Sequence, residues 1–160
     1  MLGRKSALWR RCERIASAVR LPDPFDVTEL FGEVAATRGR PIELVALDAR
    51  PGAPCGVLAA TDRADYVFYT RDTSPLHQRH ILLHELGHLL CGHVEGEMLP
   101  ETVAAVVTPT LSVDLVRRVL GRTTYAEEQE REAELVASLL MRRAADPGRG
   151  SDRLRHALGS

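Results

Sequence analysis

Two histidines four residues apart, with a glutamate between them, are the residues best suited to chemistry in this sequence. They form the run HELGH at residues 84–88. Positions i and i+4 share one face of a helix, so His84 and His88 can each point a ring nitrogen at one metal ion. Glu85 lies about 100° round that helix, where it can bind the water on the ion rather than the ion itself. The pattern predicts a zinc site with Glu85 as the general base.

The residues around this run favour a helix that is buried on one side. The face opposite the histidines carries Leu82, Leu83, Leu86, Leu89 and Leu90. A glycine inside a helix costs roughly 1 kcal/mol relative to alanine, so we expect Gly87 to leave room for another backbone or for a substrate. The alternative is a surface helix whose histidines are solvated or hydrogen-bonded and hold no metal.

A catalytic zinc ion usually has three protein ligands and a water, so a third ligand is needed. The longer pattern HExxHxxGxxH would need its third histidine at position 94, one residue after His93. His93 is therefore expected to be a capping or surface residue and not the third ligand. Glu130 falls within the apolar stripe of a helix expected over 125–145, where a carboxylate is costly unless it is paired or binds metal. We therefore expect Glu130 to be the ligand, with an ion pair to an arginine as the alternative. Glu134, one turn later, is expected to orient a metal-bound histidine, and Glu132 to point to the other side.

Further residues are candidates for other roles in the same site. Cys91 or His80 as a fourth ligand would close the site and make it structural, whereas an open position with water favours catalysis. Tyr125 is expected to have a structural role, with stabilisation of an oxyanion as the alternative. If residues 66–70 form an exposed edge strand, they are expected to pair with an extended substrate.

Local sequence signals predict the elements that position these side chains. Helices are expected at about 5–20, from Asp26 to Gly39, from Ser74 to about Cys91, at 113–120, and from a capping box of Thr124 and Glu127 onwards. Strands are expected at 42–47, 56–61 and 65–70. The fold class that follows is α+β, with a small antiparallel sheet packed on a helical core that contains the HExxH helix. One domain over 1–146 and a polar C-terminal tail over 147–160 are expected.

Composition and charge exclude several other classes of protein. Apolar residues make up 44% of the chain and charged residues 27%, which is typical of a globular protein. The net charge of −1 argues against direct binding of nucleic acid. No apolar run is long enough for a membrane span, and no secretory signal is evident. The three cysteines are far apart and odd in number, so we expect a reducing, cytoplasmic location.

HELGH and the downstream run EREAELVASLLM at 130–141 together resemble the ImmA/IrrE family of metallopeptidases. The resemblance covers about residues 25–145. It implies a zincin-like minimal metallopeptidase fold and a site with His84, His88 and Glu130 as ligands of Zn²⁺, with Mn²⁺ as an alternative ion. It also implies that Glu85 is the general base and that the substrate is a protein, a helix-turn-helix transcriptional repressor.

A second class of function is compatible with the same residues. The chain would then be a non-proteolytic, zinc-containing regulatory module or a toxin-type binding module. The segment 94–123 between the two motifs is expected to cover the cleft or a partner site in either case.

Overall fold

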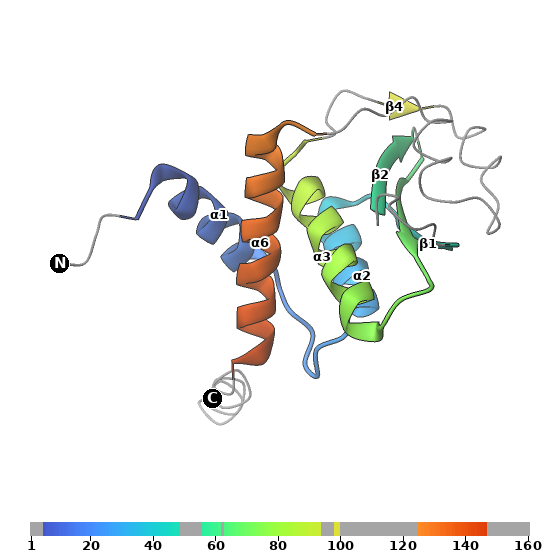
Figure 1. Cartoon of the computed structure of the whole chain (residues 1–160), viewed down its shortest axis with the longest axis horizontal. Helices are drawn as coiled ribbons and strands as arrows, with labels where there is room; N and C mark the ends of the chain where they lie inside the picture. The colour runs from blue at the N-terminus through green and yellow to red at the C-terminus, as the bar shows by residue number, and fades with distance from the viewer. Residues whose placement is uncertain (1–4, 49–55, 62, 94–97, 100–124, 147–160) are drawn as a thin grey trace.

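The computed structural model describes residues 5–48, 56–61, 63–93, 98–99 and 125–146 (Figure 1). In chain order the elements are α1 (Ala7–Ala18), α2 (Val27–Arg38), β1 (Ile42–Leu47), β2 (Gly56–Thr61), β3 (Asp65–Thr70), α3 (Pro75–Leu90), β4 (Met98–Leu99) and α6 (Glu127–Ala145). The predicted α+β class is confirmed. The expected helix at 113–120, the tail at 147–160 and all of 94–123 except β4 lie outside the described residues.

The starts of α2 and α3 follow from their capping residues. The Asp26 side chain accepts a hydrogen bond of 2.9 Å from the Glu29 backbone N–H, which satisfies a donor of the first turn of α2. Ser74 does the same for α3, where its hydroxyl oxygen accepts from the His77 N–H at 3.2 Å. These contacts confirm the predicted caps and fix the point at which the histidine helix begins.

The start of α6 differs from the prediction. Its N-cap is Ala126, and the Gln129 side-chain oxygen accepts a hydrogen bond of 3.0 Å from the Ala126 N–H. The expected capping box of Thr124 and Glu127 is therefore wrong, because Glu127 is already the first helical residue. The helix ends at Ala145, before Pro147, as the sequence predicts.

The sheet is mixed rather than antiparallel, which corrects the predicted fold. Its strand order is β1-β3-β2-β4, with β1 parallel to β3, β2 antiparallel to β3, and β2 parallel to β4. Strand β3 pairs with β1 on one side and with β2 on the other, so it is a central strand. Residues 66–70 therefore do not form an exposed edge, so the condition for substrate pairing along this strand is not met. Alternation along a strand shows which face is buried, but it does not reveal the neighbouring strand.

Helix α3 lies between the sheet and α6 (Figure 1). It packs against β2 and β3 on one side and against α6 on another, while α1 packs on α6. The buried leucines of α3 are Leu82, Leu83, Leu86 and Leu89. In the described part of the chain, no helix combines the length and hydropathy needed to cross a bilayer.

Contacts between side chains and backbone hold α1 onto α6. The Arg143 guanidinium donates hydrogen bonds to the carbonyl oxygens of Ala16 and Val19, at the end of α1. Cys12 is fully buried in the same interface, and its thiol lies 3.8 Å from the Glu132 carbonyl oxygen. These contacts fix the position of α1 relative to α6.

Candidate metal centre

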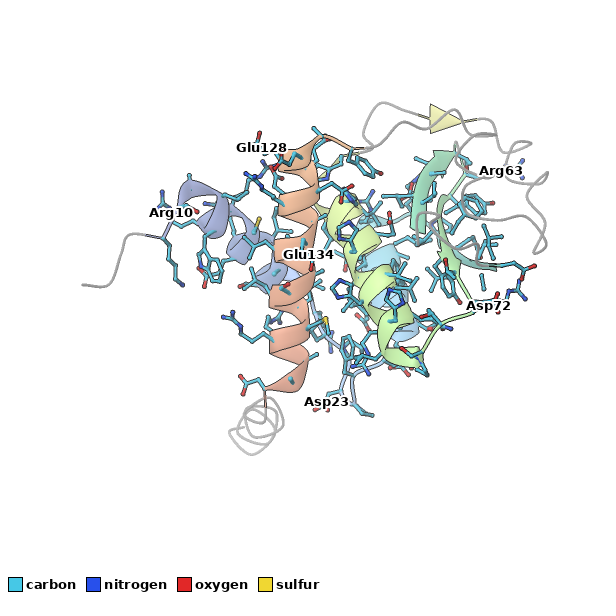
Figure 2. All side chains as sticks on the ribbon, in the orientation of Figure 1. Arg10, Asp23, Arg63, Asp72, Glu128 and Glu134 are labelled. Carbon is cyan, nitrogen blue, oxygen red and sulfur yellow. The ribbon has the colours of Figure 1, made fainter. Side chains whose placement is uncertain are left out.

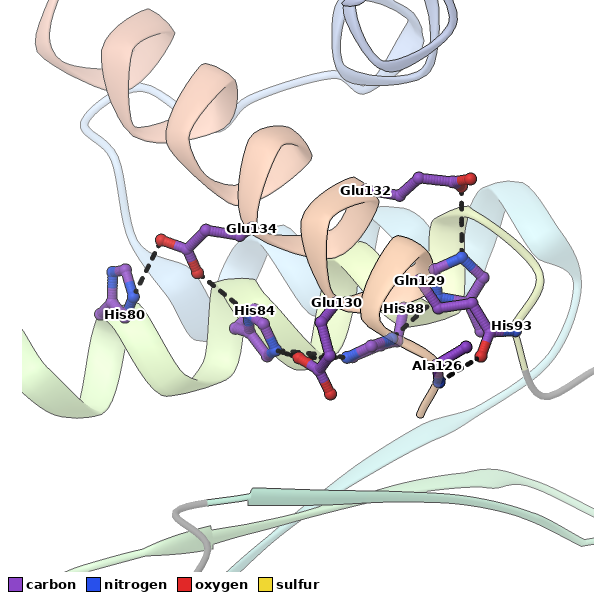
Figure 3. Close-up of polar contacts among 9 residues, drawn as sticks. All are labelled: His80, His84, His88, His93, Ala126, Gln129, Glu130, Glu132 and Glu134. Atoms are coloured by element: carbon purple, nitrogen blue, oxygen red, sulfur yellow. Dashed lines mark hydrogen bonds and ion pairs between the residues drawn. The ribbon is translucent and has the colours of Figure 1, made fainter. Parts of the chain in front are cut away.

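Facing turns of α3 and α6 bring together the three predicted metal ligands (Figure 3). The Nε2 atoms of His84 and His88 are 3.2 Å apart. The Glu130 Oε2 atom lies 2.8 Å from the His84 Nε2 and 3.5 Å from the His88 Nε2. Donor atoms around one tetrahedral zinc ion are about 3.3 Å apart, given bonds of about 2.0–2.1 Å. This triangle of two imidazole nitrogens and one carboxylate oxygen therefore fits a shared metal ion.

The protonation of His88 also fits a metal ligand. Its side chain is only 1% exposed. Burial, followed by the nearby rings of His84 and His93, lowers the pKa of His88 to about 3. The ring is therefore neutral at pH 7, as an imidazole that binds metal needs to be.

Glu130 occupies a different position on α6 from the one inferred from the sequence. Its side chain is 44% exposed, so it lies at the margin of the apolar stripe rather than within it. The buried apolar face of α6 consists of Ala133, Val136, Ala137, Leu139 and Leu140. The acid that lies inside this face is Glu132, at 6% exposure. Glu132 lies about 200° from Glu130 around α6, on the other side as expected, but that side of the helix is packed as well.

Glu134 contacts the second nitrogen of a predicted ligand. Its Oε2 atom lies 3.0 Å from the His84 Nδ1, and its Oε1 atom lies 3.5 Å from the His80 Nε2. It projects from the middle of α6, one turn after Glu130 (Figure 2). A carboxylate on Nδ1 favours a proton there and leaves Nε2 with its lone pair, so Glu134 is placed to orient His84. The expected contact is confirmed, and His80 joins the same carboxylate.

Glu85 lies on the sheet side of the histidine pair. It is buried, at 6% exposure, and its carboxylate packs against Gly56 at the start of β2. It is not among the three side chains whose donor atoms converge in the described residues. Its role as a general base stays a prediction.

Two neighbours of His88, His93 and Tyr125, contact its ring. Of the two roles expected for His93, capping is confirmed, because its backbone N–H donates to the His88 carbonyl oxygen at 3.1 Å just past the end of α3. It is not a surface residue, because its side chain is 6% exposed and its Nδ1 atom lies 2.8 Å from the His88 Nδ1. The Tyr125 ring stacks on the His88 ring with centroids 3.8 Å apart, which fits a structural role.

Cys91 lies near Glu132 rather than at the predicted ligand triangle. Cys91, His93 and Glu132 have donor atoms within 4.8 Å of one another. Burial, and then the Glu132 carboxylate, raises the pKa of Cys91 to about 12, so its sulfur is a thiol at neutral pH.

The exposed side of the ligand triangle opens onto a hollow in the surface. The hollow is lined by His84, Glu127, Glu130, Arg131, Glu134 and Leu135. The His84 side chain is 22% exposed and Glu130 is 44% exposed, so both can be reached from solvent. An incoming ion or substrate group therefore has access from this side.

Comparison with known proteins adds no assignment. No protein-family model matches the chain. No curated protein matches it significantly.

Proposed function

We propose that this chain is a zinc-dependent endopeptidase of the kind that its two motifs resemble. The observation that carries the proposal is the convergence of His84, His88 and Glu130 from two helices, with the buried Glu85 beside them. Two imidazoles and one carboxylate are a donor set that suits Zn²⁺, with Mn²⁺ as the alternative ion. The chemistry that the ion supplies when bound is polarisation of a carbonyl and a lower pKa for water.

Glu85 performs the proton transfers in this proposal. It takes a proton from water as the water oxygen attacks the peptide carbonyl carbon. It then gives that proton to the amine nitrogen as the C–N bond breaks. Its burial against Gly56 restricts the carboxylate to few orientations, which favours transfer along one direction.

The proposed substrate is a helix-turn-helix transcriptional repressor in the cytoplasm. This rests on the resemblance of HELGH and EREAELVASLLM to the ImmA/IrrE family. Cleavage of such a repressor would derepress its genes.

The test combines the purified chain with the helix-turn-helix regulator encoded beside its gene, with Zn²⁺ or Mn²⁺. Fragments are identified by mass spectrometry for the parent, for Glu85→Gln, and for the control Glu33→Gln on the exposed side of α2. Cleavage by the parent and the control, but not by Glu85→Gln, is expected. Cleavage that survives Glu85→Gln would contradict the general-base role. If the parent and both variants bind the regulator tightly but none of them cleaves it, the result would instead favour a non-proteolytic regulatory module.

A further inference from the structure

A chain of polar side chains continues from the second nitrogen of His88 (Figure 3). The His88 Nδ1 atom lies 2.8 Å from the Nδ1 of His93, and the His93 Nε2 atom lies 3.2 Å from the Glu132 Oε2. The other oxygen of Glu132 accepts a hydrogen bond of 3.2 Å from the Arg11 guanidinium. The sequence assigned His93 and Glu132 no part in the site, yet together with Arg11 they link His88 to α6 and to α1.

Proton positions along this chain follow from the role of His88. If Nε2 of His88 binds metal, its single proton is on Nδ1, which donates to the Nδ1 of His93. A neutral His93 then carries its own proton on Nε2 and donates to Glu132. The Glu132 carboxylate accepts from His93 on one oxygen and from Arg11 on the other. Each hydrogen bond then has one donor and one acceptor.

We propose that His93 is a positioning residue that fixes the ring orientation and tautomer of His88. Glu132 anchors His93 from α6, and Arg11 anchors Glu132 from α1. The inference rests on the metal centre of the proposed function. The burial of this chain supports the positioning role. The side chains of His88, His93 and Glu132 are 1%, 6% and 8% exposed, so water competes little for their hydrogen bonds.

The same structure argues against a second ion held by Cys91, His93 and Glu132. An ion on the Nε2 of His93, which faces Glu132, would leave the proton of that ring on Nδ1. That N–H would then face the Nδ1–H of a metal-bound His88 at 2.8 Å, with no acceptor between them. If His88 and His93 each bound an ion through Nε2, both Nδ1 atoms would carry a proton, and the hydrogen bond between the two rings would be lost.

The first test measures Co²⁺ and Zn²⁺ affinity by competition with a chromophoric chelator. The variants are His93→Leu and His93→Gln, the second of which keeps a side-chain oxygen as acceptor. The control is His77→Leu, because His77 lies in the first turn of α3 and its ring is hydrogen-bonded to Thr73 just before that helix. We expect about 10- to 100-fold weaker binding for His93→Leu, partial recovery for His93→Gln and no change for His77→Leu.

The second readout needs no substitution. In the Co²⁺-loaded protein, a paramagnetically shifted, slowly exchanging imidazole N–H signal is expected in proton NMR from the Nδ1–H of His88 on His93, because both side chains are buried. The Nδ1–H of His84 on Glu134 should give a second shifted signal that exchanges faster, because these side chains are 22% and 48% exposed. The absence of any slowly exchanging shifted signal would overturn the positioning role.

The remaining outcomes separate this inference from the proposed function. If the unmodified chain binds neither ion, both fail. If it binds one ion and His93→Leu binds it equally well, only the role of His93 fails. Two ions per chain, with a thiolate-to-cobalt charge-transfer band that Cys91→Ser removes, would overturn the positioning role in favour of a second metal site.

Discussion

A methyl group on Gly87 would lie 2.5 Å from the backbone carbonyl oxygen of Ala133. The Cα and carbonyl carbon of Ala133 would lie at 2.9 and 3.0 Å. The glycine inside the HELGH motif therefore allows α3 and α6 to touch through their backbones. Ala133 lies between Glu130 and Glu134, so this contact sets the distance from the histidines to both carboxylates.

Gly87→Ala is expected to destabilise the protein by about 1–3 kcal/mol, because neither backbone can move without separating the helices. The same separation should weaken metal binding. Urea unfolding and chelator competition measure the two effects. The matched control is Gly32→Ala in α2, where a Cβ meets nothing within 4 Å, and a stabilisation of up to about 1 kcal/mol is expected. Unchanged stability in Gly87→Ala would show that the helices do not need this approach.

Gly56→Ala should separate catalysis from metal binding. Its Cβ would lie 2.8, 3.0 and 3.1 Å from the Oε1, Cγ and Cδ atoms of Glu85, so the carboxylate has to move from its position. We expect metal affinity to stay within about twofold of the parent, while the cleavage rate falls by 10-fold or more because the carboxylate is displaced. The rate and the affinity are measured on the same preparation. A parent-like rate would argue that Glu85 needs no fixed position.

Glu134→Ala is expected to weaken metal binding by about 10-fold, because His84 loses the partner on its Nδ1 atom. Glu130→Ala should weaken it further, since this removes a ligand. Glu33→Ala is the control, because Glu33 is exposed on α2 and does not line the hollow at the ligand triangle, so the affinity should be unchanged. Equal losses from Glu134→Ala and Glu130→Ala would contradict their different roles.

The metal-free protein should lose stability as the pH falls below about 6.5. The pKa of His88 is about 3 when folded against an ordinary value of 6.5, so between these values the unfolded chain binds a proton that the folded chain does not. Stability therefore rises with pH through this window, by at most about 1.4 kcal/mol per pH unit from one group. Urea unfolding between pH 5 and pH 7 measures the slope. His88→Asn should flatten it, and an unchanged slope would assign the effect to other groups.

The local signals of the sequence predicted most elements closely. The capping residues Asp26 and Ser74 and the three longer strands are where the sequence places them, because these features depend on neighbours along the chain. The order of the strands depends on contacts between distant segments. The mixed sheet was therefore beyond a prediction from alternation alone.

Helical spacing predicts that His84 and His88 share a face, and the second motif points to Glu130 as their partner, although Glu130 lies at the margin of the apolar stripe and not within it. The arrangement of His93 and Glu132 was not predictable. The chain leaves α3 at Gly92, whose φ of 75° turns it back so that the His93 N–H donates to the His88 carbonyl oxygen at 3.1 Å. A helical wheel does not extend past such a turn. For Glu132 a signal existed, because the wheel places it beside Val136 and Leu139, both of which are buried.

The contact at Gly87 also bears on how divergent relatives of this chain should be sought. Between His88 and Glu130 lie 41 residues, and nothing in the pairing of the two helices fixes that number. The atoms that a Cβ at Gly87 would meet belong to the Ala133 backbone, so no change of side chain on α6 can compensate for a larger residue there. A search profile should therefore tolerate any gap between the two motifs, and require glycine as the fourth letter of HELGH wherever the helices pack this closely.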